Sequence, residues 1–348
     1  MILQQHFLYR LKLVFVFLLV KMEFIQRFVP KSLKDKLPTS TGLNNRMFWT
    51  AFKSRGKRVY LDYYSKLKEP VSYKPKAVVD SQYKLTEEDI RFFHENGYIG
   101  PFDLISSDEV KQIREHLVDL ATNTESKIHS YSQGYYEFKE STSETEVNNN
   151  KEVSKVINLI NRHLEDSLLQ NLFKNSAITE RCAQLLGPDL ILWRSAFFQI
   201  PPHSNGTTWH QAHTWLFENM RESVVQPPDF EEIFQVTCWI ALTDAYKENG
   251  CMALIPGSHK EMYPSKMNVN QKVLGKYERG NGNYGGELDY QVDPQKVKLI
   301  EMKAGQFYLF SERLVHGSAD NVTDNSRWGV NGRITRTDVK VYTDKMLN

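Results

Sequence analysis

Seven short runs rich in β-branched and aromatic residues follow one another through the second half of this chain of 348 residues. They cover residues 190–200, 207–215, 234–242, 251–255, 297–302, 306–310 and 328–335. Turn-forming pairs separate them, among them Pro201-Pro202, Pro256-Gly257 and Ala304-Gly305. Short strands at such spacing are typical of an all-β sandwich or barrel, so we expect a mainly β fold with a jelly-roll core.

The residues before these runs predict helices. A capping-box pattern over Thr86–Asp89 opens the first helix, and Gly97 ends it. Three apolar residues are expected on its buried side: Ile90, Phe92 and Phe93. A second capping box at Ser106–Glu109 opens another helix, and helical spacing returns from Val153 to about Leu186. We therefore expect flanking helices that form an N-terminal layer on the jelly-roll core.

Two polar stretches interrupt these predicted elements. Residues 123–152 are rich in Ser, Thr, Glu and Asn, and residues 258–295 are rich in Gly, Asn and Tyr. Both are too long for simple connections within a compact domain, so we interpret them as possible lids over a binding site. Residues 1–84 are expected to form a basic N-terminal extension, and residues 85–348 one folded domain.

Charge is distributed unevenly along the chain. Residues 1–80 carry 16 Lys and Arg against 5 Asp and Glu, although the formal net charge of the whole chain is only +2. Such a basic arm is either a solvated extension or a docking surface for an acidic partner, such as a carrier protein or an anionic membrane. The arm contains no nucleic-acid-binding motif, so a nucleic-acid partner is not expected.

An apolar segment of eight residues, Leu13 to Val20, lies near the start of the sequence. About 20 apolar residues are needed to span a bilayer, so we do not expect membrane insertion. No small-residue cleavage site of a signal peptide follows. We therefore favour Met22 as the start of the protein. In the alternative, residues 1–21 belong to it and form a marginal apolar segment. Three scattered cysteines, Cys182, Cys238 and Cys251, give no disulfide framework, which favours a reducing, cytoplasmic setting.

The tetrapeptide His210-Gln211-Ala212-His213 has the form of an iron-binding motif that lacks one ligand. Mononuclear non-haem Fe(II) oxygenases usually bind the metal through two histidines and one carboxylate, which lies two residues after the first histidine. Here Ala212 takes the place of that carboxylate. Residues two apart on a strand share a face, so His210 and Ala212 point inward while His213 points away unless the strand bulges.

A second histidine ligand must come from another strand, and His316 is the best candidate. It follows the run 306–310, and Arg327 lies eleven residues after it. An arginine at this place suits a dicarboxylic cosubstrate such as 2-oxoglutarate, because its guanidinium holds a carboxylate with a fork of donors that lysine lacks. Alone, the histidine pair is weak evidence, since single histidines are more often ordinary core or surface residues.

Several segments around these residues resemble one family in the same order along the chain. They are Trp193–Phe198, Gly206–Ala212, Asn249–Ser258, Met302–Phe307 and His316–Ser318, followed by Arg327. Over roughly residues 85–338, the chain is similar to the chlorinating non-haem iron enzymes of the phytanoyl-CoA dioxygenase superfamily. The specific part is the HxA pattern of His210 and Ala212, because hydroxylating relatives carry HxD or HxE.

The resemblance implies a double-stranded β-helix, cupin-like core and a metal site. Fe(II) would be bound by His210 and His316, and chloride would bind where Ala212 replaces the carboxylate. A carboxylate and a chloride each supply one negative charge, so the exchange preserves the charge of the site. O2 and 2-oxoglutarate complete the set of cofactors and cosubstrates that the resemblance implies.

The resemblance also implies roles for residues around the cosubstrate. Arg327 would form the ion pair with 2-oxoglutarate, and Thr207 and Trp239 would contact its distal carboxylate. As residue types, Thr207 and Trp239 suit ordinary strand and core positions equally well. Arg333 would support the chloride and the cosubstrate through hydrogen bonds.

The expected function is oxidative chlorination, and also bromination, of an unactivated aliphatic carbon in natural-product biosynthesis. The resemblance favours an acyl or aminoacyl substrate tethered to a carrier protein, with an acidic carrier docking on the basic arm. His213 and Phe217 depart from the family pattern, which affects the identity of the substrate more than the iron chemistry. The alternatives are a hydroxylase of a small molecule, a halogenase of a free-standing substrate, and a binding protein on a decayed scaffold.

Overall fold

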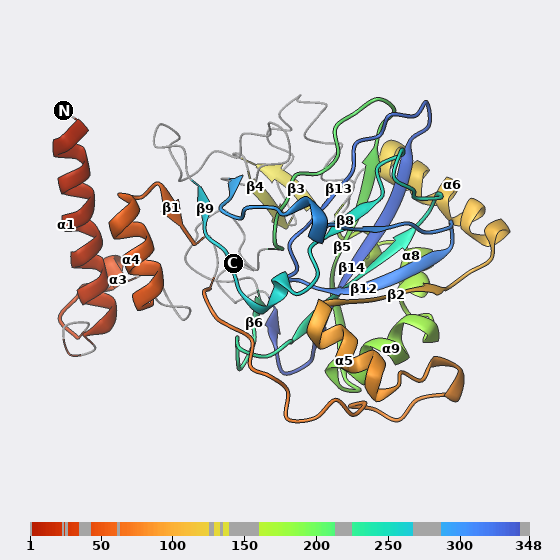
Figure 1. Ribbon diagram of the computed structural model, residues 1–348, viewed down its shortest axis with the longest axis horizontal. Helices are drawn as coiled ribbons and strands as arrows, with labels where there is room; N and C mark the ends of the chain where they lie inside the picture. Colours follow the sequence, from red (N-terminus) through yellow and green to blue (C-terminus); the bar gives the residue numbers. More distant parts are fainter. Residues whose placement is uncertain are drawn as a thin grey trace.

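A five-stranded antiparallel sheet forms the centre of the molecule (Figure 1). The computed structural model describes residues 2–22, 24, 27–34, 43–60, 63–124, 129–132, 135–138, 160–212, 225–266 and 287–341. The strands lie in the order β2 (Tyr98–Asp103), β12 (Gln306–Ser311), β7 (Gln235–Ala241), β14 (Arg327–Arg336) and β5 (Leu190–Ile200). Every neighbouring pair joins strands that are distant in sequence, so the sheet is complete only when β14 lies between β7 and β5.

A smaller sheet lies against one face of the central sheet. It consists of β11 (Lys298–Ile300), β8 (Met252–Leu254) and β13 (His316–Ser318). Between the two sheets, Trp239 and Tyr308 of the central sheet pack in one buried cluster with Met252 and Leu254 of the smaller one. Two packed antiparallel sheets with long crossings form the jelly-roll core, so the fold class expected from the sequence is confirmed.

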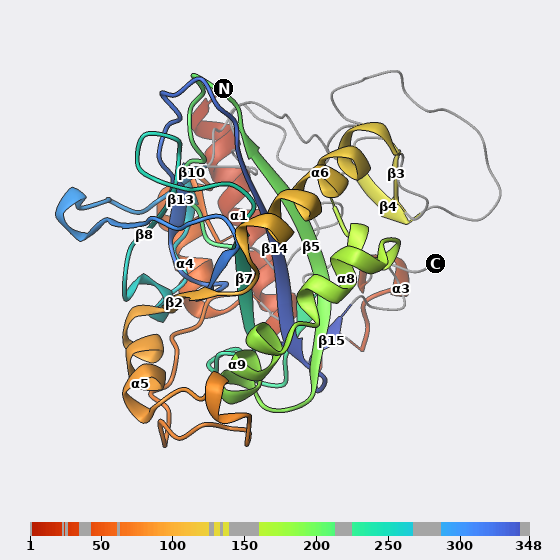
Figure 2. The ribbon, with the colours of Figure 1, turned by 90° about the vertical axis from the view of Figure 1, so that its right-hand side faces the viewer.

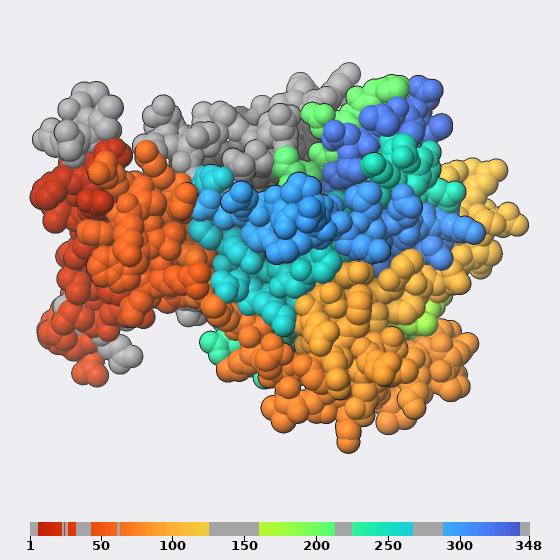
Figure 3. All heavy atoms as spheres, in the orientation of Figure 1, coloured from red at the N-terminus to blue at the C-terminus, as the bar shows by residue number. Residues whose placement is uncertain are grey.

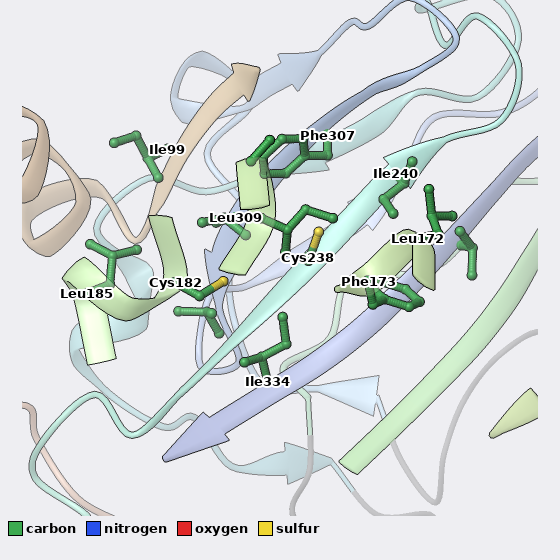
Figure 4. Packing of buried hydrophobic residues seen from close by; sticks show 14 of the residues in the cluster. Ile99, Leu172, Phe173, Cys182, Leu185, Cys238, Ile240, Phe307, Leu309 and Ile334 are labelled. Carbon is green, nitrogen blue, oxygen red and sulfur yellow. The ribbon is translucent and has the colours of Figure 1, made fainter. Parts of the chain in front are cut away.

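Helices cover the other face of the central sheet (Figure 2). They are α5 (Glu87–Asn96), α6 (Ser107–Asn123), α8 (Ser167–Phe173) and α9 (Ser176–Leu186). Figure 4 shows Cys182 and Leu185 of α9 in the same packed cluster as Cys238 of β7 and Leu309 of β12. Burial of this apolar surface holds the helical layer on the sheet. All three cysteines are buried and unpaired.

Both predicted capping boxes are present at the starts of helices. The side chains of Thr86 and Ser106 accept hydrogen bonds from the backbone N–H groups of Asp89 and Glu109. The carboxylates of Asp89 and Glu109 accept the N–H groups of the two capping residues in return. Gly97 then ends α5 with a φ of 82°, which glycine adopts without strain.

Two expectations about the helices are wrong. Phe92 is 41 % exposed, because it lies on the outer side of α5, with its ring edge-on to Tyr98. The helical stretch expected up to Leu186 is divided in its described part into η2 (Arg162–Leu164), α8 and α9. The division has a local cause, since the side chains of Asp166 and Asn175 each cap the start of a new helix.

Six of the seven expected runs contain a strand, and β2 and β13 are among the strands that lie outside these runs. The run at 207–215 is not a regular strand in its described part, which ends at residue 212 and makes a single β-bridge at His210. Strand β2 was not expected, because Gly100 and Pro101 interrupt its pattern. A proline is tolerated there because β2 lies at the edge of the sheet.

The N-terminal extension forms a pair of helices beside the domain (Figure 1). α1 (Ile2–Lys21) packs along α4 (Asn45–Ser54), and the rings of Phe17 and Phe48 stack with their centroids 4.3 Å apart. The short α3 (Lys31–Lys34) lies between them in sequence. In the described part of the chain, no helix is long and apolar enough to cross a membrane.

Most of the two predicted lids lies outside the described residues. The first is described only at the hairpin of β3 (His129–Ser132) and β4 (Tyr135–Phe138) and at its start. The ends of the second form η3 (Ser258–Lys260), β9 (Ser265–Lys266), β10 (Glu287–Leu288) and η4 (Pro294–Lys296). Short elements elsewhere are η1 (Ser81–Tyr83), β6 (Val225–Gln226), β15 (Lys340–Val341) and β1 (Arg58–Val59), which pairs with β9. The lid role stays a prediction.

A buried histidine joins α5 to the segment that follows β8. His259 of η3 is fully buried, and its Nε2 donates to the carbonyl of His94 at 3.0 Å. Gly97 lies directly over the ring, since a Cβ at this position would come within 2.6 Å of Nδ1. Burial lowers the pKa of His259 to about 4, so the folded state holds this ring neutral.

We expect mild acid to weaken the fold through His259. The pKa of His259 is about 4 in the fold and 6.5 for an ordinary histidine, so between these pH values the unfolded chain binds more protons. The stabilisation that the fold gains from the neutral His259 ring is complete above pH 6.5 and is lost as the pH falls toward 4. The loss between pH 7 and pH 5 is about 2 kcal/mol in the free energy of unfolding.

Denaturant titrations at the two pH values measure this loss. His259→Gln should make the pH dependence shallower, because the amide does not titrate. The remaining slope comes from other histidines whose pKa is lowered by burial, among them His94. The matched change at an exposed position, His203→Gln, should leave it unchanged, since that side chain is 63 % exposed. An unaltered slope in His259→Gln would show that other groups are responsible.

Candidate active site

Two histidines from distant parts of the chain lie side by side. His210 and His316 form an antiparallel β-bridge in which each backbone N–H donates to the carbonyl of the other residue at 2.9 Å. Residues paired in this way project their side chains to the same side. The two imidazole rings accordingly lie with their centroids 4.1 Å apart. The structure thus brings together the two metal ligands proposed from the sequence.

Each ring presents a free nitrogen of the same type toward the site. Nδ1 of His210 donates to the carbonyl of Thr208 at 2.8 Å, and Nδ1 of His316 donates to that of Leu314 at 2.7 Å. A proton fixed on Nδ1 leaves the lone pair of Nε2 for a metal ion. Burial lowers the pKa of both rings, and that of His316 falls well below its usual value, so both are neutral ligands.

Neighbouring segments fix the positions of the two histidines. Leu254 of β8 pairs with His316, and Ser258 Oγ accepts the N–H of Val315 at 2.9 Å. On the other side, the buried amide of Gln211 donates to the carbonyl of Glu261 at 2.8 Å and accepts the N–H of Tyr263 at 2.9 Å. Gln211 therefore ties the first histidine segment to the chain that follows η3.

Ala212 occupies the position at which a carboxylate ligand would be expected. It is buried, and its N–H donates to the carbonyl of Glu312 at 2.9 Å. No group of three or more His, Cys, Asp and Glu side chains that could hold a metal ion occurs in the described ranges. Within those ranges the donor set is two neutral imidazoles. His213, considered as a third ligand, lies outside the described residues.

Arg327 provides a buried positive charge in the same core. Only 1 % of the residue is exposed, and Nε and Nη2 donate to the carbonyl of Gly250 at 3.0 and 2.6 Å. Nη1 is also buried and has no hydrogen-bond partner among the described residues. Burial lowers the pKa of Arg327 to about 10, so the guanidinium still carries its charge near neutral pH. A buried cation with an unused donor is well suited to bind a carboxylate.

Tyr308 adds a second unused donor that was not expected from the sequence. Its hydroxyl is fully buried without a hydrogen-bond partner in the described structure. Burial raises the pKa of Tyr308, so the hydroxyl keeps its proton, and the charge of Arg327 is near enough to act against this rise. The only indication of this role in the sequence is the position of Tyr308 in the run 306–310, where it shares a strand face with Phe310.

Trp239 lies close to both donors. Its ring lies 5.2 Å from the Arg327 guanidinium and 6.1 Å from the ring of Tyr308, measured to ring centroids. The indole also covers Gly329, where an added Cβ would come within 2.2 Å of it. Trp239 thus lies beside Arg327 and Tyr308, and its contact with 2-oxoglutarate stays a prediction.

The remaining two proposed residues, Thr207 and Arg333, come from different segments of the chain. Thr207 exchanges hydrogen bonds with Ser318: its N–H donates to Ser318 Oγ at 2.7 Å, and its carbonyl accepts the Ser318 N–H at 3.0 Å. Arg333 stacks over the ring of Trp193, with its guanidinium carbon 5.7 Å from the centroid. The Arg333 charge further lowers the pKa of both histidines, so it lies within electrostatic reach of them.

A family model described as phytanoyl-CoA dioxygenase (PhyH) matches residues 93–329, which include the histidine pair, Ala212 and Arg327. This chain belongs to the phytanoyl-CoA dioxygenase family. A probable phytanoyl-CoA dioxygenase of Caenorhabditis elegans is 25% identical over 272 residues, which cover 75% of this chain and 78% of the relative. An ectoine dioxygenase of Streptomyces coelicolor is 26% identical over 252 residues, or 70% of this chain and 75% of the relative.

Solved structures share the fold of this PhyH-family chain. CytC3 with Fe(II) and alpha-ketoglutarate matches it with a TM-score of 0.52 and 23% identity, over 75% of this chain and 81% of that one. EctD from S. alaskensis with bound Fe matches with a TM-score of 0.51 and 17% identity, over 78% and 83%. The family makes this protein an oxidoreductase of the Fe(II)- and 2-oxoglutarate-dependent oxygenase type.

The residues of this chain fit both groups. His210 and His316 supply two neutral Nε2 donors of the kind that Fe(II) accepts. Arg327 Nη1 and the Tyr308 hydroxyl are buried donors without partners in the described structure, as the distal carboxylate of 2-oxoglutarate requires. Both groups can therefore bind without displacing an existing hydrogen bond of these donors.

We expect Tyr308→Phe to weaken binding of 2-oxoglutarate by about ten- to a hundredfold, because a buried hydrogen bond to a charged group is worth about 1.5 to 3 kcal/mol. Anaerobic titration of the Fe(II) protein, followed by the charge-transfer absorption of the bound 2-oxoacid, measures the dissociation constant without turnover. Tyr98→Phe, in the same apolar cluster, is the control and should bind 2-oxoglutarate normally. Equal affinity of the Tyr308 variant and the parent would remove Tyr308 from the site.

Proposed function

We propose that this protein is a halogenase that places chlorine or bromine on an unactivated aliphatic carbon of a natural-product precursor. When bound, Fe(II) and 2-oxoglutarate supply oxidative hydrogen abstraction with O2. The observation that carries the proposal is Ala212, which stands two residues after His210 where a two-histidine, one-carboxylate site has its carboxylate. The alanine cannot bind the metal, so an exogenous anion can take that place.

Charge balance supports a halide at this position. His210 and His316 are neutral, so the protein supplies one negative charge fewer than a site with a carboxylate ligand. Arg333 adds a positive charge within electrostatic reach of both rings. An anion beside the metal is therefore favoured on two counts, by the missing carboxylate and by the nearby guanidinium.

Each residue of the proposed site has a separate role in binding or in electrostatic stabilisation. His210 and His316 hold the metal through Nε2, and their Nδ1 hydrogen bonds keep the rings in one orientation. Arg327 and Tyr308 bind the far carboxylate of the cosubstrate, with Trp239 excluding water from the same region. Arg333 stabilises the halide through its positive charge.

For the substrate we propose an acyl or aminoacyl group tethered through phosphopantetheine to a carrier protein, with a free small molecule as the alternative. Hydroxylation is a second candidate reaction, because the relatives from C. elegans and S. coelicolor are named dioxygenases. In that reaction, water would take the position proposed for the halide. The two reactions differ in whether a halide binds at the metal.

We expect chloride to bind the Fe(II) and 2-oxoglutarate complex of the parent protein and not that of Ala212→Asp, whose carboxylate would refill the coordination position. Absorption of the anaerobic complex during a chloride titration measures this without a substrate. Ala212→Gly is the matched control, because it adds no ligand and should retain the chloride response. A parent protein that does not respond to chloride, or an Asp variant that responds equally, would contradict the role of Ala212.

We also expect product masses to follow the halide that is supplied. With carrier-bound and free substrates assayed in chloride and then in bromide, mass spectrometry should show gain of chlorine and then of bromine, each replacing one hydrogen. The Ala212→Asp variant should lose halogenation by at least about a hundredfold, since the halide has no metal position. Products that gain only oxygen under saturating halide would establish hydroxylation instead.

A further inference from the structure

The outer face of α1 is apolar along most of its length. Five large side chains recur there at steps of three or four residues, and each is between 38 % and 62 % exposed: Phe7, Leu11, Phe15, Leu18 and Met22. These steps keep side chains on one face of a helix. We refer to these five residues as the α1 stripe. The opposite face is covered by α4, where Phe17 stacks on Phe48.

Positive charge borders the α1 stripe. Lys12 and Lys21 are exposed and lie on opposite edges of the stripe, because successive residues are about 100° apart around a helix. The described residues up to Tyr60 include eleven Lys and Arg and no Asp or Glu. Trp49 of α4 is 50 % exposed and has Lys53 5.9 Å from its ring. Two of these cations, Arg46 and Arg58, form ion pairs with Glu261 and Asp289, so the helical pair combines exposed aromatic rings with an excess of positive charge.

The position of the helical pair leaves this surface accessible. Figure 3 shows α1 at one end of the molecule, with the central domain extending away from it. The helical pair is joined to the domain in part by the two-residue pairing of β1 with β9. The two helices project from the domain at this end (Figure 3). In the described part of the chain no helix is long and apolar enough to span a bilayer, which leaves binding parallel to a surface as the geometry open to α1.

We propose that the N-terminal helical pair docks on an anionic lipid surface, with α1 lying in the plane of the interface. The α1 stripe would enter the boundary between headgroups and acyl chains, where Phe and Leu side chains leave water. Lys12 and Lys21 would meet phosphate groups on either side, and the other cations would add long-range attraction. This inference concerns where the enzyme acts and does not depend on halogenation.

The surface chemistry favours lipid over the other possible occupants. A second copy of this chain would bring two strongly positive helical pairs together, and like charges repel across such an interface. An acidic carrier protein would satisfy the cations, but a highly charged partner gives no reason for five exposed apolar side chains in one line. An anionic membrane satisfies both features at once, because it offers negative headgroups above an apolar layer.

Sedimentation of the full chain with lipid vesicles tests the proposal. We expect binding to vesicles of phosphatidylcholine with about 30% phosphatidylglycerol, and much weaker binding to phosphatidylcholine alone or at high salt. The double variant Phe7→Glu/Phe15→Glu should lower the partition coefficient at least about tenfold, because two inserted rings become charged. The control Val71→Glu/Val78→Glu adds the same charge at fully exposed positions outside the pair and should bind nearly as the parent does.

Several results would overturn the proposal. One is the absence of binding to anionic vesicles, and another is equal binding by the parent and Phe7→Glu/Phe15→Glu. A dimer in vesicle-free ultracentrifugation that this variant dissociates would assign the stripe to a second copy. Stripe-dependent binding of an acidic carrier protein in place of vesicles would assign it to that partner. Circular dichroism and the charge-transfer band with 2-oxoglutarate should be unchanged in both double variants, which separates lipid docking from the active site.

Discussion

The β-bridge between His210 and His316 determines where chemistry can occur in this fold. Two reciprocal backbone hydrogen bonds join segments more than a hundred residues apart and set both rings on one side. The carbonyls of Thr208 and Leu314, within the same two segments, then select the tautomer. The metal site is thus specified mainly by backbone geometry, and Gln211 and Ser258 keep that backbone in place.

Burial gives the rest of the site its chemical character. The same apolar surroundings keep the histidines neutral, keep the Tyr308 hydroxyl protonated and leave the Arg327 charge with an unused donor. An isolated buried cation is costly, and a bound carboxylate offsets that cost. Binding of 2-oxoglutarate should therefore stabilise the folded protein as well as prepare it for reaction.

Local sequence patterns predicted much of this structure. The capping boxes at Thr86 and Ser106 depend on residues three apart, and strands such as β5 and β7 have continuous β-rich runs, so both could be predicted from the sequence. Spacing and resemblance also indicated the histidine pair. The edge strand β2 was not predicted, because Gly100 and Pro101 interrupt its local pattern. The role of Tyr308 was not predicted, because it depends on neighbours distant in sequence. Tyr308 becomes significant only when β12, β7 and β14 place it near Arg327.

Gly329 shows how a residue can control a ligand that it does not touch. Any side chain at this position would displace the indole of Trp239, which already lies within contact distance of the missing Cβ. The indole can move only at the expense of the space around Arg327, because their 5.2 Å separation is already that of a packed pair. A side chain at position 329 would therefore act on a carboxylate bound by Arg327 through the indole, without touching that carboxylate itself.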